Sequence, residues 1–125
     1  MEKEADLLSQ ASGHNSGIAC TGVDAEIGSI ERALIRESVS CLKSHLETFN
    51  LPYRPMGSLV CDWGDDANNN SSADKLQEVV SESNIAGDSD VCKLSNSEVL
   101  NLEPNINPKI KGAVHIHGET IVDPW

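Results

Sequence analysis

Two histidines and a glutamate near the C-terminus are the residues whose types and spacing could bind a metal ion. His115, His117 and Glu119 alternate along a segment rich in β-branched residues. Alternate residues of a β-strand point to the same face, so these three would present two imidazoles and a carboxylate together. We nevertheless expect the histidines to face solvent on a small hairpin, without a metal.

The same histidines carry a short resemblance to a known family. His115-Ile116-His117 is similar to the H-x-H that opens the metal motif of cupins, and the resemblance implies that both histidines are ligands. It covers only these few residues. Cupins have a longer gap before their glutamate and a distant third histidine, whereas Glu119 follows His117 here after a single glycine.

Other catalytic patterns are absent from the sequence. It contains no G-x-S-x-G, no G-x-x-x-x-G-K-[ST], no H-E-x-x-H, and no glycine-rich loop between a predicted strand and helix. The four cysteines lack a C-x-x-C pair, which favours free thiols in a reducing compartment. They are Cys20, Cys41, Cys61 and Cys92. We therefore predict a protein that is not an enzyme and has no cofactor.

The element with the clearest periodicity is an amphipathic helix predicted over residues 24–50. Its apolar residues recur at steps of three and four, which places them on one stripe of an α-helix. Asp24 is predicted to cap the first turn, and Asn50 to end the helix. Gly28 weakens the first turns, so the firm portion is expected from about Ile30.

This stripe is the predicted partner-binding surface. Its residues are Ile30, Leu34, Ile35, Val39, Leu42, Leu46 and Phe49. The second half follows the spacing of a coiled-coil seam, which favours pairing with a partner helix or with a second copy of the chain. Packing on the rest of the same chain is the alternative.

The remaining segments are predicted to contain little regular structure. Residues 1–23 are expected to form a flexible leader. Residues 51–94 are expected to form an acidic, largely disordered middle with a short helix near 73–81. Residues 95–125 are expected to form a short helix and a β-like tail, either a hairpin or a single strand. The predicted fold class is accordingly mostly disordered and small α-dominated.

Composition supports this expectation and limits the partners. Only four residues are aromatic, and the formal net charge is −11. We therefore expect neither nucleic acid nor an anionic membrane as a partner, because both are bound through basic patches. No apolar run reaches the roughly 20 residues of a membrane span, and the N-terminus lacks the order of a secretory signal. We expect an intracellular protein of the nucleus or cytoplasm.

The function predicted from the sequence is that of a small, acidic, non-enzymatic interaction or regulatory subunit. It would pair with another protein through the helix, with no small-molecule substrate. One alternative is an acidic transcriptional regulator acting through short linear motifs, since the segment from Leu100 to Pro104 is similar to the leucine-x-leucine repression motifs of plant regulators. The other is a small metal-binding protein that uses His115, His117 and Glu119.

Overall fold

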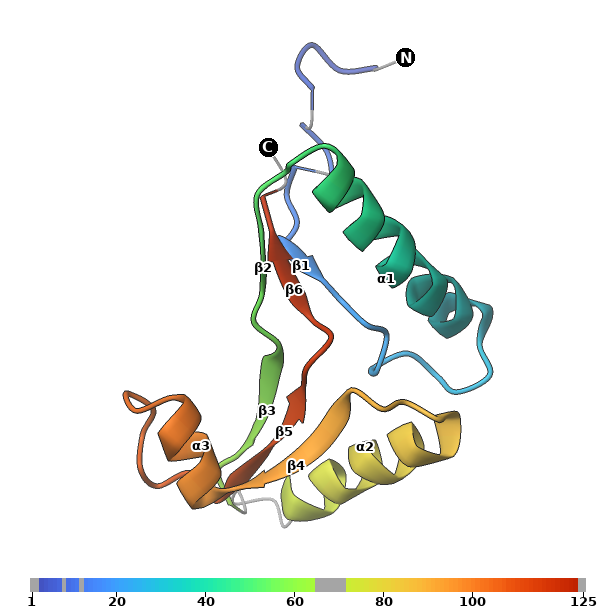
Figure 1. The fold of residues 1–125 in the computed structure, drawn as a ribbon. Coiled ribbons are helices and arrows are strands. Elements are labelled where there is room, and N and C mark those ends of the chain that lie inside the picture. Colours follow the sequence, from blue (N-terminus) through green and yellow to red (C-terminus); the bar gives the residue numbers. More distant parts are fainter. Residues whose placement is uncertain (1–2, 8, 12, 65–71, 124–125) are drawn as a thin grey trace.

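The computed structural model describes residues 3–7, 9–11, 13–64 and 72–123 (Figure 1). Helices and strands alternate along this part of the chain. The helices are α1 (Ile30–Thr48), α2 (Ser72–Ala86) and α3 (Asn96–Leu102). The strands are β1 (Ile18–Ala19), β2 (Tyr53–Pro55), β3 (Ser58–Asp62), β4 (Val91–Ser95), β5 (Gly112–Ile116) and β6 (Thr120–Val122).

The strands form two three-stranded antiparallel sheets within the described residues. One has the order β1-β6-β2 and the other the order β3-β5-β4. Short connections join β2 to β3 and β5 to β6, so two extended segments of the chain run from one sheet into the other (Figure 1). Between the two sheets these segments stay side by side, and the Gly57 N–H donates to the Glu119 carbonyl at 2.9 Å.

Glycine is required at position 57, between β2 and β3. Its φ is +71°, a conformation that side chains disfavour. A Cβ there would lie 2.5 Å from Nε2 of His115 and 2.9 Å from the Ile116 carbonyl oxygen. The absent side chain leaves the space that the His115 ring occupies.

The core lies on both faces of the β3-β5-β4 sheet. Val114 and Ile116 of β5 pack against Leu76 of α2, whereas Ala113 of β5 packs against Val99 of α3. This alternation is the period of two that a strand imposes on its side chains. β5 is therefore a central strand covered on each face by a helix.

Arg32 ties helix α1 to the connection between α2 and β4. Arg32 is 6% exposed, and its Nη1 donates to three backbone carbonyls in the segment before the helix. They belong to Gly22, Val23 and Ala25. Its Nη2 pairs with Asp88, which lies in the connection between α2 and β4. The start of α1 is thus tied to a segment far along the chain.

The structure contradicts the predicted fold class. The described chain is an α/β structure with two sheets, not a mostly disordered or α-dominated chain. The argument from composition was wrong because it took the small number of aromatic residues as a sign that the chain could not form a core. Small branched residues such as Val99 and Val114, each 0% exposed, fill the thin layers between the β5 sheet and its helices.

The predicted boundaries also differ from the observed ones. Residues 51–94, expected to be largely disordered, contain β2, β3, α2 and β4, and α2 is longer than the helix expected near 73–81. The tail does not form a hairpin of its own, because β5 and β6 belong to different sheets. β6 pairs instead with β1, inside the predicted leader, and with β2.

Two local predictions agree with the structure. Helix α1 begins at Ile30, although Ser29 rather than Asp24 caps it. The Ser95 and Glu98 pattern forms a capping box at the start of α3. None of the described helices combines the length and apolar character needed to cross a membrane.

Candidate functional site

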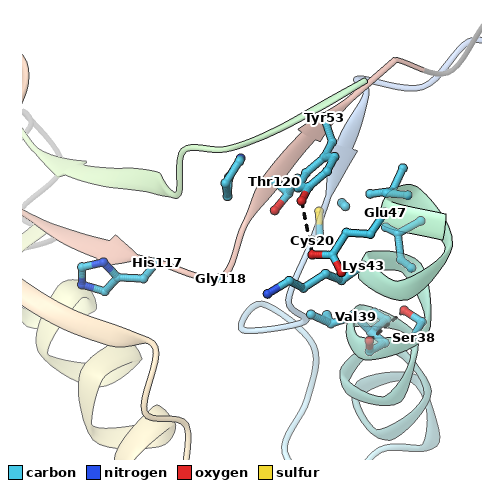
Figure 2. A pocket seen from close by; sticks show the side chains of 14 residues that line it. Cys20, Ser38, Val39, Lys43, Glu47, Tyr53, His117, Gly118 and Thr120 are labelled. Carbon is cyan, nitrogen blue, oxygen red and sulfur yellow. Dashed lines mark hydrogen bonds between the residues drawn. The ribbon is translucent and has the colours of Figure 1, made fainter. Parts of the chain in front are cut away.

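A cavity of about 590 Å³ separates α1 from the β1-β6-β2 sheet (Figure 2). Its helix wall is mainly apolar and comprises Ile35, Val39, Leu42 and Leu46. Ala19, Tyr53, Pro55 and Thr120 contribute the opposite wall. The volume lies within the roughly 300–1,000 Å³ typical of small-molecule sites, and an apolar lining with a few polar groups is their usual character.

The polar groups of the cavity come from both walls. Tyr53 Oη donates to Glu47 Oε1 at 3.4 Å, which links β2 to α1 (Figure 2). Lys43 extends from α1 into the space between helix and strands, and it forms no ion pair with any described residue. The charged groups of the α1 wall are therefore one lysine, Lys43, and one carboxylate, Glu47, which accepts from Tyr53. The ammonium group of Lys43 is the one on this wall that suits an anionic ligand.

Cys20 lines the same cavity but is not set up as a nucleophile. Burial raises the pKa of its thiol, and the nearby carboxylates of Glu119 and Asp24 raise it further. The thiolate is the reactive form of cysteine, so this thiol stays protonated at neutral pH.

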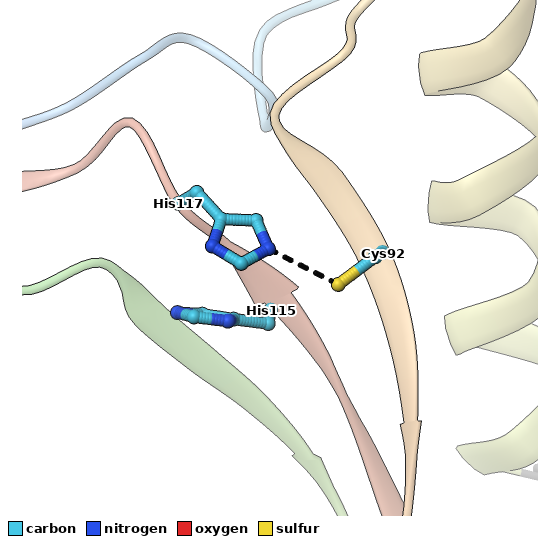
Figure 3. Close-up of side chains that lie close together, drawn as sticks. All are labelled: Cys92, His115 and His117. Carbon is cyan, nitrogen blue, oxygen red and sulfur yellow. Dashed lines mark hydrogen bonds between the residues drawn. The ribbon is translucent and has the colours of Figure 1, made fainter. Parts of the chain in front are cut away.

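A second group of reactive side chains lies where β4 and β5 run side by side (Figure 3). Cys92 and His115 are opposite each other in the strand register, and the Cys92 Sγ lies 3.2 Å from Nε2 of His117. The rings of His115 and His117 are 3.9 Å apart between centroids. Burial and the neighbouring His117 lower the pKa of His115, against a hydrogen bond to the Met56 backbone that raises it.

The structure separates the predicted metal candidates. His115 and His117 come together, but their partner is Cys92 on the neighbouring strand and not Glu119. Glu119 lies in the connection between β5 and β6, beyond the end of the strand that was expected to align the three residues. His115 is half-buried, whereas His117 is exposed as expected.

The predicted partner-binding stripe is divided between two environments. Ile35, Val39, Leu42 and Leu46 line the cavity inside the molecule. Ile30, Leu34 and Phe49 are 78%, 58% and 64% exposed. The structure thus directs four of the seven stripe residues towards the cavity and leaves the other three in solvent.

Sequence reasoning missed Lys43, Tyr53 and Thr120 in the cavity and Cys92 beside the histidines. Lys43 lies four residues after Val39 of the stripe, and this spacing was the available signal that it shares a helix face with the stripe. The others become neighbours only through strand pairing between distant segments.

Comparison with known proteins defines the class. The family model of the FAD dependent oxidoreductases matches residues 1–125, so the chain belongs to that family. The fold agrees, because the structure superimposes on a glycine oxidase from Geobacillus kaustophilus with a TM-score of 0.75 at 20% identity, covering 91% of this chain and 31% of that one.

The similar sequences are more specific. A glycerol 3-phosphate dehydrogenase of Caloramator mitchellensis is 29% identical over 125 residues, which are 100% of this chain and 25% of that protein. A glycerol 3-phosphate oxidase of Mycoplasma pneumoniae is 25% identical over 99% of this chain and 32% of its own length. The solved structure of an L-alpha-glycerophosphate oxidase from Mycoplasma pneumoniae, with FAD bound, has a TM-score of 0.74 and 27% identity, covering 98% of this chain and 32% of that chain. The chain thus spans about a quarter to a third of the length of these relatives.

These findings overturn the predicted function. Membership of an oxidoreductase family contradicts a non-enzymatic regulatory subunit, and it equally contradicts the transcriptional alternative. The coiled-coil and disorder descriptions are wrong as well. The expectation of a protein partner without a small-molecule substrate fails because relatives are named for oxidising glycerol 3-phosphate. The error arose because family membership here is not carried by a short catalytic motif.

The residues of this chain do not by themselves fit the whole of FAD. The pyrophosphate of a dinucleotide is usually held at a glycine-rich turn between a strand and the start of a helix. No G-x-G-x-x-G occurs in the sequence, and the start of α3 carries the capping box of Ser95 and Glu98. The cavity beside α1 has instead a mainly apolar lining with Lys43 and Glu47 as charged groups.

Proposed function

We propose that this chain forms part of the substrate site of an FAD-dependent oxidoreductase that acts on a small anionic hydroxy compound of the glycerol 3-phosphate type. The observation that carries the proposal is the match to glycerol 3-phosphate enzymes along the whole chain, including every residue that lines the cavity. An L-2-hydroxyglutarate dehydrogenase of Caenorhabditis elegans is 27% identical over 84% of this chain. Both named substrates are small anions with a secondary hydroxyl group.

Lys43 is the residue that we assign to the anionic group of the substrate. An ammonium group is a compact cation that binds phosphate or carboxylate as a point charge. Lys43 itself is exposed. The apolar side chains of Ile35, Val39 and Leu42 line the same wall, so an anion bound in the cavity would be partly shielded from water, which strengthens such an interaction relative to a fully solvated pair. The Tyr53 and Glu47 pair keeps the helix and strand walls in register on the same side.

The test is a binding titration of the purified chain by isothermal titration calorimetry, with glycerol 3-phosphate, L-2-hydroxyglutarate and glycine compared. We expect the anionic hydroxy compounds to bind and glycine to bind much more weakly. Lys43→Met should raise Kd by about tenfold to a hundredfold, because a charge-assisted contact contributes about 1.5–3 kcal/mol. Lys75→Met, on the exposed face of α2, is the matched control and should leave Kd unchanged. Preferential binding of glycine, or an unchanged Kd in Lys43→Met, would contradict the assignment.

A further inference from the structure

We propose that Cys92, His115 and His117 form a zinc-binding site. One potential ligand atom from each residue lies within 4.8 Å of the others, and all three residues belong to the described part of the chain. Cys92 lies on β4, His115 on β5, and His117 directly after β5 (Figure 3). The site is separate from the walls that receive the substrate in the proposed function, except that His117 borders the cavity.

The backbone already places these residues together. Cys92 and His115 are register partners, so their side chains lie on the same face of the β3-β5-β4 sheet. His117 is held by its own backbone N–H, which donates to the Asp90 carbonyl at 2.7 Å. The arrangement therefore follows from strand pairing and does not depend on a mobile loop.

The distances suit a tetrahedral zinc ion. With Zn–S of about 2.3 Å and Zn–N of about 2.0–2.1 Å, tetrahedral angles place sulfur about 3.5 Å from each nitrogen and the nitrogens about 3.3 Å apart. The Cys92 Sγ to His117 Nε2 distance of 3.2 Å is close to this requirement. The 4.8 Å limit on the other separations leaves a contraction of at most about 1.5 Å, which side-chain rotation can supply.

The surroundings of His115 resemble the support that a metal ligand needs. A hydrogen bond to the Met56 backbone orients the ring, and bonds of this kind fix the imidazole of metal-binding histidines. The ring also fills the space left by Gly57, where a Cβ would lie 2.5 Å from Nε2. The ring is therefore positioned by the backbone at the junction of the two sheets before any ion binds.

The ligand types select the metal. A thiolate with two imidazoles favours zinc over magnesium or calcium, which prefer oxygen ligands. Three protein ligands leave the fourth position for water or another molecule. Because residues 117–119 connect β5 of one sheet to β6 of the other, a bound ion would also fix the junction of the two sheets to β4.

The test uses the full chain without an affinity tag, stripped of metal and titrated with Zn²⁺ against a chromogenic chelator. We expect one equivalent of Zn²⁺ and a higher melting temperature, since an ion that binds only the folded state stabilises it. Co²⁺ in place of Zn²⁺ should give the near-ultraviolet charge-transfer band of a thiolate ligand. Cys92→Ser should abolish this band and weaken Zn²⁺ binding at least tenfold. His117→Asn should also weaken Zn²⁺ binding at least tenfold.

Cys41→Ser and His45→Asn are the matched controls, because both residues are exposed on α1. They should leave the stoichiometry and the Co²⁺ band unchanged. Circular dichroism of each metal-free variant shows whether it folds, and His115→Asn provides a third ligand variant if one of the others does not. The proposal is overturned if the chain binds no equivalent of Zn²⁺, if Cys92→Ser binds as the parent does, or if the control variants lose binding equally.

Discussion

At the scale of single residues, two arginines of α1 connect segments that lie far apart in the sequence. Arg32 is buried among backbone carbonyls and pairs with Asp88. Arg36 Nη2 lies 2.8 Å from Asp88 Oδ2, an ion pair without hydrogen-bond geometry, and its Nη1 donates to Asp90 at 3.1 Å. A strongly acidic chain thus uses two of its few cations to neutralise carboxylates inside the fold.

Replacing Arg32 should therefore be costly. Arg32→Met leaves the 8%-exposed Asp88 with only Arg36 and removes the donor to three carbonyls. Breaking a buried pair costs about 3–5 kcal/mol, and we expect about 3 kcal/mol because Arg36 remains. Arg54→Met, exposed on β2, should change the free energy of unfolding by no more than about 0.5 kcal/mol. Equal effects in chemical denaturation would show that the buried pair is not important for stability.

At the scale of elements, α3 shows how a short helix is stabilised by the residue that caps its N-terminus. The Ser95 side chain and then its backbone N–H donate to the Glu98 carboxylate and lower the pKa of Glu98 below its ordinary 4.5. The Glu98 N–H in turn faces the Ser95 hydroxyl at 3.4 Å. This exchange satisfies backbone groups that a helix of 7 residues would otherwise leave unpaired.

The cap should make stability depend on pH. Because folding lowers the pKa of Glu98, the ionised carboxylate stabilises the folded state above the unfolded-state pKa. That contribution is lost as the pH falls through the lower folded-state pKa. Glu98→Gln should therefore be less stable than the parent at neutral pH, and the difference should shrink below about pH 4. Urea unfolding at several pH values measures it. Glu78→Gln, exposed on α2, should show no such convergence, and a constant difference for Glu98→Gln would contradict the role of its charge.

At the scale of the whole molecule, stability depends on covering both faces of one central strand. β5 pairs with β3 and β4, and helices α2 and α3 bury its opposite faces. The β1-β6-β2 sheet has shorter strands, and the cavity separates it from α1. Close packing is therefore concentrated around β5, whereas the space available to a ligand lies between α1 and the β1-β6-β2 sheet.

Two valines test this distribution with one chemical change. Val99 on α3 is 0% exposed and Val60 on β3 is 41% exposed. Val99→Ala removes two buried methyl groups and leaves a cavity, which should cost about 2–3 kcal/mol. Val60→Ala should cost less than about 1 kcal/mol, mainly through strand propensity. Thermal melts compare the two variants, and similar losses would show that α3 does not cover a rigid core.

Local features of the sequence predicted local features of the structure. The apolar period placed a helix where α1 lies, and the Ser95 and Glu98 spacing predicted the capping box. Both depend on residues no more than one or two turns apart, whose geometry is set by the helix itself. The histidine pair at 115 and 117 was also identified, because a strand places alternate residues on one face.

Only the tertiary structure decided which distant residues meet. Strand pairing set Cys92 opposite His115, and it placed β5 and β6 in different sheets instead of a hairpin. Four stripe residues of α1 face a cavity whose opposite wall comes from β1, β2 and β6. None of these contacts has a sequence period, since each joins segments whose separation the chain's local geometry does not constrain. The family likewise became evident from the whole chain and not from a motif, because the residues that form its fold are spread over the full 125 positions.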